Sequence, residues 1–501
     1  MFENFSTFTF DKSLTKQVPY SFVKKHLFLP IMTRGSAVLV ATFDPFNMDA
    51  IEELRLLLKA NIETIFVPKH AILAAIHECY TQEDAPESTS NKTASQVRDE
   101  FQETDGEIYD LLDDSSEMSP AIKLINFAVG DAIQQNASDI HFEPEERGLI
   151  IRYRIDGALQ VRLSTSNDVT QQLLTRLKVM AKLDIAERRL PQDGRVKMRL
   201  GGKIVDFRVS TVPTVTGERI VLRILDKGNI VLGLDKICMP PDMLQRFREG
   251  IDHPEGIILV TGPTGSGKTT TLYSALTELK NDDTNIMTIE DPVEYRLQGI
   301  AQIGIHPKIG LTFAAGLRHI LRQDPDIIMI GEIRDRETAE IAIQAALTGH
   351  LVLSTLHTND APSAIVRLVD MGIEPYLISS CVIGVLAQRL VRKICPYCRI
   401  SYEPSKTERT SVGTSITELY KGKGCPECLE SGFKGRQGIY ELMTITGDIR
   451  KQILISPEAT ALHNVATRHG MKTLRDHGMQ LIQEGTTTLE EVWRATKSND
   501  E

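Results

Sequence analysis

The sequence has no long apolar run and few aromatic residues. No apolar stretch approaches the roughly 18 residues that cross a bilayer, and the chain does not open on the basic and then apolar pattern of a signal peptide. We therefore expect a cytoplasmic protein that partner proteins hold at any membrane where it acts. Aromatic residues make up 6% of the chain and tryptophan occurs once, at Trp493, so little surface is predicted for stacking on nucleic-acid bases.

A basic surface for binding nucleic acid is also missing. The formal net charge is −10, and the segment from Thr81 to Glu117 accounts for it, with twelve acidic residues against Lys92 and Arg98. The rest of the chain is balanced in charge, which argues against a nucleic-acid partner. Because the same segment is rich in Ser, Thr and Gln and poor in regular apolar spacing, we interpret residues 81–117 as an acidic flexible linker.

The first 80 residues predict a small α/β domain. A length of 501 residues indicates three or four domains of ordinary size, and the linker sets residues 1–80 apart from the others. Two segments of this part favour strands and two show helical spacing. The strands are expected at Ala37–Thr42 and Thr64–Val67, and the helices at Met48–Ala60 and Ala71–Cys79.

Residues 118–226 predict a second domain, of the α+β class. Ser119 and Pro120 indicate the start of a helix, because a serine side chain can accept a bond from the first free amides and proline fits the first turn. Four further segments alternate between apolar and polar residues as strands do, with one helix between them. The strands are expected at 139–143, 149–155, 204–209 and 219–225, and the helix at 169–183.

The next 150 or so residues alternate apolar strands with helices, which is typical of a parallel α/β sheet. We assign residues 239–390 to this domain and 227–238 to the linker before it. A cysteine-containing element is expected at 391–435 and a helical region at 436–501. In that last region the helical spacing from Leu462 to Trp493 is broken by Gly470, Gly478 and Gly485.

A candidate phosphate-binding loop follows the apolar run Gly256–Thr261. Its sequence, Gly262-Pro-Thr-Gly-Ser-Gly-Lys-Thr269, matches GxxxxGK[ST] and leads into a helix-compatible segment. The glycines let successive amides face phosphate oxygens, and the helix presents its positive end to the same anion. The alternative is a glycine-rich turn that only joins strand to helix. The residues expected to bind nucleotide are Gly262, Pro263, Thr264, Gly265, Ser266, Gly267, Lys268, Thr269 and Thr270.

Two residues of this loop have specific predicted roles. Lys268 is expected to reach the β- and γ-phosphates of ATP and to be catalytic. Thr269 is expected to offer its hydroxyl to Mg²⁺, which offsets the charge of the transition state.

Two acidic clusters follow further predicted strands. Glu290, Asp291 and Glu294 end one strand, and Glu332 ends the apolar run 327–330, at the edge where open α/β sheets bind ligands. A glycine stands where the usual second nucleotide motif has aspartate. We predict that Glu294 and Glu332 are catalytic and that Glu290 and Asp291 contact the nucleotide. Which carboxylate holds the metal and which activates water stays open.

A third strand is predicted at 349–355, with His350 near its start and His357 just after its end. A histidine after a strand can sense the γ-phosphate through a hydrogen bond, and it can equally be a satisfied structural residue. We place both in the predicted nucleotide site.

Together these residues resemble the secretion ATPase superfamily, and most closely the type II secretion system ATPases, the E component of the general secretion pathway. Four family boxes are present: a Walker A loop at 262–269, an Asp box at 288–294, an atypical Walker B at 327–332 and a His box at 349–357. Further family-like strings lie at 138–144, 189–195, 217–219 and 435–441. The resemblance covers essentially residues 118–450.

The resemblance implies a RecA-like ATPase domain behind a PAS-like second domain, in a homo-hexamer with ATP between the two. It also implies that arginines reach the phosphates: Arg208 and Arg223 from the second domain, and Arg318, Arg322 and Arg334 from the ATPase domain. An arginine supplied by a mobile domain couples hydrolysis to movement, so Arg208 and Arg223 are predicted to be catalytic. For each arginine the alternative is a surface salt bridge.

The resemblance further implies membrane partners. In these relatives the N-terminal domain docks on a bitopic inner-membrane protein, which here would bind residues 1–80. The other expected partners are the inner-membrane platform protein and acidic phospholipid. The protein would then be cytoplasmic and peripherally attached to the inner membrane.

Four of the seven cysteines form two CxxC knuckles, Cys395-Pro-Tyr-Cys398 and Cys425-Pro-Glu-Cys428. Each knuckle can point both thiolates at one centre, and two knuckles complete a tetrahedral Cys₄ zinc site without an open position, so the metal would be structural. The alternative is a pair of disulfides or redox-active dithiols, which a reducing cytosol disfavours. Cys79, Cys238 and Cys381 are interpreted as ordinary positions.

The predicted function is hydrolysis of Mg-ATP to power type II protein secretion. A type IV pilus extension ATPase is the nearest alternative, because it shares every core box. Two other classes are a nucleic-acid translocase, which the charge balance disfavours, and a nucleotide-sensing scaffold that barely turns over. The chain keeps Lys268, Thr269, Glu294 and Glu332, so nothing in it looks disabled.

Overall fold

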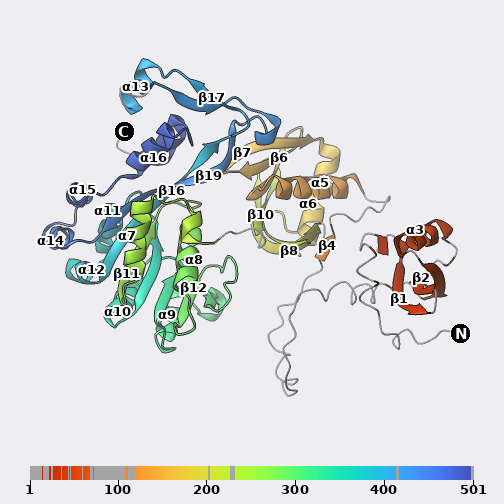
Figure 1. Ribbon diagram of the computed structural model, residues 1–501, viewed down its shortest axis with the longest axis horizontal. Coiled ribbons are helices and arrows are strands. Elements are labelled where there is room, and N and C mark those ends of the chain that lie inside the picture. The colour runs from red at the N-terminus through yellow and green to blue at the C-terminus, as the bar shows by residue number, and fades with distance from the viewer. Residues whose placement is uncertain are drawn as a thin grey trace. The chain divides into compact units, whose positions relative to one another are not determined.

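The structure, a computed structural model, divides the chain into two units, residues 1–104 and 105–501 (Figure 1). It describes residues 26–34, 37–42, 47–58, 60–67, 108–110, 119–200, 203–225, 232–412 and 417–497, with a few single residues between 14 and 72. Among these residues no helix has the length and apolar character that crossing a bilayer requires.

The first unit contains the small α/β domain that the sequence predicts. Its elements are β1 (Phe28–Arg34), β2 (Ala37–Thr42), α3 (Met48–Leu58) and β3 (Asn61–Phe66). β1 and β2 are antiparallel, and α3 makes the crossover that lets β3 run parallel to β2. The apolar side of α3 places Leu54 in the core with Val38 and Val40. The helix expected at Ala71–Cys79 lies outside the described residues, apart from Ile72.

The second domain is a seven-stranded sheet against which two helices pack, which confirms the α+β prediction. The strand order is β4-β8-β9-β10-β5-β6-β7, and each neighbouring pair is antiparallel except β4 and β8. The elements are β4 (Ile108–Asp110), α5 (Pro120–Gln134), β5 (Asp139–Glu145), β6 (Gly148–Ile155), β7 (Ala158–Thr165), α6 (Asn167–Met180), β8 (Gln192–Leu200), β9 (Lys203–Thr214) and β10 (Gly217–Leu225).

Two details of this domain differ from the expectation. Residues 108–110, inside the range interpreted as a linker, form strand β4 and pair with β8, so that interpretation is wrong at this point. Ser119 stands at the N-cap of α5 as predicted, but its side chain makes no capping hydrogen bond. Pro120 occupies the first turn, where its missing N–H costs nothing.

The ATPase domain is built on a second seven-stranded sheet, in the order β13-β12-β14-β15-β11-β16-β19. All neighbouring strands are parallel except β16 and β19 at one edge. The elements are η2 (Leu234–Lys236), α7 (Pro241–Ile251), β11 (Gly256–Thr261), α8 (Lys268–Leu279), β12 (Ile286–Glu290), β13 (Ala301–Gly304), η3 (Pro307–Ile309), α9 (Phe313–Ile320), β14 (Ile327–Ile330), α10 (Arg336–Leu347), β15 (Leu351–Leu356), α11 (Ala361–Asp370), α12 (Pro375–Cys381), β16 (Val382–Ile394) and β19 (Phe433–Thr444).

Both faces of this sheet are buried, as the continuous apolar strands predict. In β11, Ile258 and Val260 pack with α7 and α8 on one face, whereas Ile257 and Leu259 pack with α9, α10 and α11 on the other. Since successive side chains of a strand alternate between faces, one strand contributes to two cores. This arrangement holds the carboxyl ends of β11, β12, β14 and β15 at one edge.

The cysteine-containing element is an insertion between β16 and the edge strand β19. It comprises β17 (Arg399–Tyr402), α13 (Lys406–Val412), β18 (Leu419–Gly422) and η4 (Pro426–Cys428). The boundaries predicted at 390 and 435 fall inside β16 and β19, and residues 436–444, expected in a helical region, continue β19 as a strand. The sequence analysis missed strand β19 because β19 pairs with β16, which lies on the other side of the insertion in the sequence. Local sequence patterns do not reveal such a long-range pairing.

Among the described residues after β19, up to residue 497, there are four helices: α14 (Gly447–Ile455), α15 (Ala459–Arg468), α16 (Leu474–Gln483) and α17 (Leu489–Thr496). Gly470 and Gly485 lie in left-handed turns between helices, at φ of 84° and 68°, as their spacing predicts. Gly478 lies inside α16 instead. A Cβ there would come within 2.5 Å of Val492, so this glycine lets α16 and α17 approach closely.

Candidate nucleotide-binding and metal sites

The phosphate-binding loop has the setting that its motif requires. The fully buried strand β11 ends at Thr261, and α8 begins at Lys268. Gly262 and Gly267 adopt φ of 150° and 90°. A Cβ at these two positions would lie 2.4 Å from the carbonyl oxygen and 2.6 Å from Nε2 of Gln388, so only glycine fits. The strand and the helix thus stand where the motif requires them, and nucleotide binding by this loop stays a prediction.

Lys268 lies folded over this loop. Its Nζ donates hydrogen bonds to the carbonyl oxygens of Gly262 at 2.7 Å and Pro263 at 3.0 Å. Burial lowers the pKa of Lys268 to about 8, and the positive charge of Arg389 acts in the same direction, against Glu332. An ammonium group that has lost this much hydration gains strongly from a neighbouring anion. The hydroxyl of Ser266 is buried in the same loop without a partner among the described residues.

Glu332 and His357 meet beside Lys268, at the ends of neighbouring strands β14 and β15. The Oε2 atom of Glu332 lies 3.3 Å from Nε2 of His357, and Oε1 accepts a short hydrogen bond from Arg334. Burial alone would raise the pKa of Glu332, but Arg334 and His357 outweigh it and the net shift is downward. Burial and the charge of Lys268 lower the pKa of His357. Glu332 therefore stays ionised between two donors.

Glu294 faces the second domain. Its side chain keeps an exposed surface, yet surrounding protein desolvates it enough to raise its pKa. The charges of Arg223 and Arg208 act in the opposite direction on this pKa, and that of Glu290 adds to the increase. Both arginines thus lie within electrostatic reach of Glu294, as the prediction of a site between the two domains requires.

The structure places the other two acidic residues of this strand end differently. Glu290 is buried and accepts hydrogen bonds from Tyr273, Thr288 and Gln302, the one from Gln302 at 3.1 Å. Its carboxylate oxygens are therefore occupied by hydrogen bonds inside the protein. Asp291 is exposed, and its charge contributes to the raised pKa of Arg334. Of these two, Asp291 is the better placed for a ligand.

His350 does not lie at the nucleotide site, and its assignment to that site is wrong. It precedes β15, whereas the phosphate-binding loop follows the carboxyl end of β11, which runs parallel to β15. The length of β11 separates the two edges by roughly 17 Å. The Nδ1 atom of His350 lies 2.9 Å from the carbonyl oxygen of Ala345, near the end of α10. Of the two roles considered for this histidine, the contact fits the structural one.

Arg318 and Arg322 are also not joined to the cluster around Lys268 by any contact of the described residues. Arg318 pairs with Glu337 at 2.7 Å and Arg322 is exposed. Their predicted contact with phosphate stays a prediction.

Two residues of β16 were missed by sequence reasoning. Gln388 accepts a hydrogen bond from Thr271 of α8 at 2.7 Å and lies against Gly262 and Gly267 of the loop. Arg389 donates to the carbonyl oxygen of Asn359 at 3.1 Å and so ties β16 to the segment after His357. The pairing of β16 with β11 brings Gln388 and Arg389 to the loop. The local sequence around these two residues does not indicate that pairing, so sequence reasoning had no signal for them.

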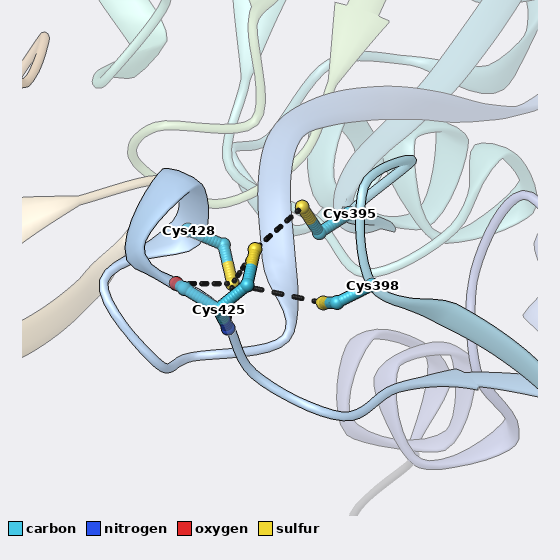
Figure 2. A group of neighbouring side chains, drawn as sticks. All are labelled: Cys395, Cys398, Cys425 and Cys428. Atoms are coloured by element: carbon cyan, nitrogen blue, oxygen red, sulfur yellow. Dashed lines mark hydrogen bonds between the residues drawn. The ribbon is translucent and has the colours of Figure 1, made fainter.

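The four paired cysteines converge on one centre, as Figure 2 shows. Their sulfurs lie within 4.8 Å of one another, with separations of 3.8 Å for Cys395–Cys425 and for Cys398–Cys428. A tetrahedral zinc site with bonds of about 2.3 Å has sulfurs roughly 3.8 Å apart. All four thiols are free, so the disulfide alternative is not found. The four cysteines could hold a metal ion in a site of the closed, four-cysteine kind.

Two backbone amides donate hydrogen bonds to one sulfur of this cluster, that of Cys428. Burial would raise the pKa of Cys428, but the N–H groups of Cys425 and Gly432 outweigh it and lower the pKa to about 7. The two amides approach the sulfur at 3.2 and 3.3 Å. Because the thiolate is the form that binds metal, this lowering favours metal binding by Cys428. Burial raises the pKa values of Cys398 and Cys425 in the same cluster, so the shift does not extend to all four cysteines.

A glycine-rich loop between a buried parallel strand and a helix, with a lysine facing carboxylates at adjacent strand ends, defines a P-loop ATPase. The chain belongs to the type II/IV secretion system protein family, whose model matches residues 114–494, and a second model, the MshEN domain, matches residues 2–86. It is a secretion ATPase of that family.

Individual relatives cover both secretion and pilus assembly. The chain is 45% identical to the type IV pilus assembly ATPase PilB of Myxococcus xanthus, over 98% of this chain and 88% of that protein. It is 44% identical to the type II secretion system ATPase E of Vibrio cholerae, over 98% of each. The crystal structure of the pilus retraction motor PilT with bound ADP matches 77% of this chain and 98% of that one, with a TM-score of 0.51 and 28% identity.

Proposed function

We propose that this chain hydrolyses Mg-ATP to power type II protein secretion at the inner membrane. The observation that carries the proposal is the meeting of Lys268, Glu332 and His357 at the carboxyl ends of β11, β14 and β15. An ammonium group, a carboxylate and an imidazole within electrostatic reach of one glycine loop suit a triphosphate and the water that attacks it. The relatives in secretion systems supply the biological setting.

Magnesium fits the donors at this edge. Bound there, Mg²⁺ would offset the negative charge of the phosphates. The oxygen ligands that the chain offers are the hydroxyl of Thr269 and the carboxylates of Glu332 and Asp291. Lys268 would hold the outer phosphates, and Arg334 keeps Glu332 ionised.

Glu294 is the better candidate for the base. A base must accept a proton, and the pKa of Glu294 is raised whereas that of Glu332 is lowered. Glu332 is already engaged by His357 and Arg334, a state that suits metal binding and phosphate sensing. We therefore assign the base to Glu294 and the metal-binding role to Glu332.

Coupling to movement would come from the second domain. Arg208 and Arg223 are cross-strand neighbours on β9 and β10 with exposed side chains, and both influence Glu294. If they contact the γ-phosphate, its loss releases the second domain from the ATPase domain. In a homo-hexamer such steps would pass from subunit to subunit, with Arg318 and Arg322 as further phosphate contacts.

Zinc is the metal we propose for the four-cysteine cluster. Its sulfur separations match tetrahedral Zn²⁺, and no open position is left for chemistry. Because the cluster closes the insertion between β16 and β19, the metal would fix the edge of the ATPase sheet.

Residues 1–80 are proposed to bind a bitopic inner-membrane protein of the secretion system, with the platform protein and acidic phospholipid as further contacts. Pilus extension is the second candidate, because a pilus assembly ATPase is 45% identical over 98% of this chain. The test is capture from inner-membrane extract by the full chain and by a variant that lacks residues 1–80.

A secretion-system membrane protein captured only by the full chain would support the proposal. Capture of pilus-assembly proteins in its place would favour the second candidate. Equal capture by both forms would contradict a docking role for residues 1–80.

A further inference from the structure

Five residues from five neighbouring strands of the second domain stand in one row. The strand pairing matches each with the next across β8, β9, β10, β5 and β6. Directly opposed residues of a sheet point to the same face. The row is Arg195, Arg208, Arg223, Asp139 and Arg154. Four cationic side chains therefore share a face, and a single carboxylate stands among them.

Asp139 stands fourth in this row and interacts with both of its neighbours, Arg223 and Arg154. Its Oδ1 accepts a hydrogen bond from Nε of Arg223 at 2.9 Å, and its Oδ2 accepts one from the hydroxyl of Ser138 at 2.8 Å. The Nε of Arg154 lies 3.7 Å from Oδ2. The side chain of Asp139 is 8% exposed, whereas that of Arg223 is 61% exposed. The carboxylate is thus fixed, and it holds the arginine by its inner nitrogen only.

We propose that Asp139 is a positioning residue for ATP hydrolysis, which orients Arg223 toward the phosphates. An arginine held at Nε has fewer accessible rotamers and presents its outer guanidinium nitrogens in a fixed direction. This inference rests on the proposed role of Arg223 as a phosphate contact. The charge of Arg223 acts on the pKa of Glu294, so the guanidinium lies within electrostatic reach of that carboxylate.

The same strand offers a matched control. Glu143 lies four residues after Asp139 on β5 and also pairs with two arginines, Arg219 at 2.6 Å and Arg152 at 2.5 Å. Its side chain is 16% exposed, so loss of its ion pairs should cost the domain about as much stability. Neither arginine is a proposed phosphate contact. A purely structural role for Asp139 therefore predicts equal effects of Asp139→Ala and Glu143→Ala.

The experiment is steady-state ATP hydrolysis by the full-length assembled protein, with melting temperatures measured in parallel. We expect Asp139→Ala to lower kcat by about 10- to 100-fold with KM within about twofold, because misplacing a group that acts in the transition state affects kcat. Glu143→Ala should keep kcat within about twofold. Arg223→Ala should lose at least about 100-fold, and Asp139→Ala combined with Arg223→Ala should be no slower than Arg223→Ala alone.

Each outcome decides between the possibilities. Equal kcat values for Asp139→Ala and Glu143→Ala, or an additive loss in the double variant, would overturn the positioning role. Wild-type kcat in Arg223→Ala would instead overturn the proposed phosphate contact itself. If Asp139→Ala does not fold, Asp139→Asn serves, since it keeps an oxygen for Nε; it should show a smaller kcat loss at unchanged KM, and wild-type kcat and pH profile in that variant would contradict the role of the charge.

Discussion

The carboxylate of Glu332 and the imidazole of His357 lie 3.3 Å apart at the ends of two adjacent strands. This contact joins the Walker B and His boxes through two residues that are 25 positions apart in sequence. The charge of Lys268 also lowers the pKa of His357. The Glu332–His357 pair is therefore coupled electrostatically to the phosphate-binding loop. A change in phosphate occupancy at Lys268 would therefore reach the histidine through direct electrostatics.

We expect Glu332→Gln to bind ATP and cleave it slowly. The glutamine keeps the shape of the side chain but loses the charge that holds Arg334 and His357 and that would hold Mg²⁺. Nucleotide affinity measured by titration should stay within about tenfold of wild type, with kcat lower by at least about 100-fold. Wild-type turnover would count against the assignment.

Glu294→Gln should change the pH dependence of hydrolysis. The base must be deprotonated, so kcat falls as pH drops through the pKa of Glu294, and burial places that pKa above its ordinary value. In wild type we expect kcat to fall at low pH, the acid limb of the pH profile. In Glu294→Gln we expect a large drop of kcat and no acid limb. An unchanged acid limb in this variant would assign the base elsewhere.

Cys395→Ser should remove zinc. The wild-type chain is expected to hold about one zinc per chain, measured by elemental analysis, and loss of one ligand should lower both the zinc content and the melting temperature. Cys238→Ser is the matched control, because Cys238 is exposed and stands outside the cluster. A serine variant at 395 with full zinc and unchanged stability would refute the Cys₄ centre.

Glu441→Gln should remove a pH dependence of stability. Burial raises the pKa of Glu441 from 4.5 to about 7, although the backbone N–H groups of Ala361 and Leu474 donate to its carboxylate at 2.8 and 3.2 Å. Between these two pH values the folded chain binds the proton more tightly than the unfolded chain does, so this residue makes the protein less stable as pH rises from 4.5 to 7.

The measurement is the melting temperature of wild type and Glu441→Gln between pH 5 and pH 8. Relative to the variant, wild type should melt at a higher temperature at pH 5 than at pH 8. Each pH unit in the window contributes at most about 1.4 kcal/mol. Parallel curves for the two proteins over the whole range would contradict the buried, raised pKa.

Local motifs allowed much of the ATPase core to be predicted. The strand before Gly262 and the helix after the loop could be predicted, because a buried strand, a glycine turn and a helix start each depend on residues that are adjacent in sequence. The same holds for the convergence of the cysteines, since each CxxC knuckle fixes two ligands locally. The α+β class of the second domain followed from period-two alternation in β5, β6, β9 and β10.

Features that depend on distant pairing were missed. Strands β7 and β8 were not predicted, because their apolar alternation is weak and their places depend on β6 and β9. Glu290 was predicted to contact nucleotide, yet Tyr273 and Gln302 draw it into the core. His350 was misassigned because spacing alone does not say which end of a strand faces the ligand.

The most direct test of the account is ATP binding and hydrolysis by wild type and Lys268→Ala, with each protein measured both as single subunits and as assembled rings. Lys280→Ala is the control, because that lysine is exposed just beyond the end of α8. We expect Mg-dependent hydrolysis in wild type and the control, and none in Lys268→Ala. Wild-type protein without affinity for adenine nucleotides in either form, or full turnover in Lys268→Ala, would contradict it.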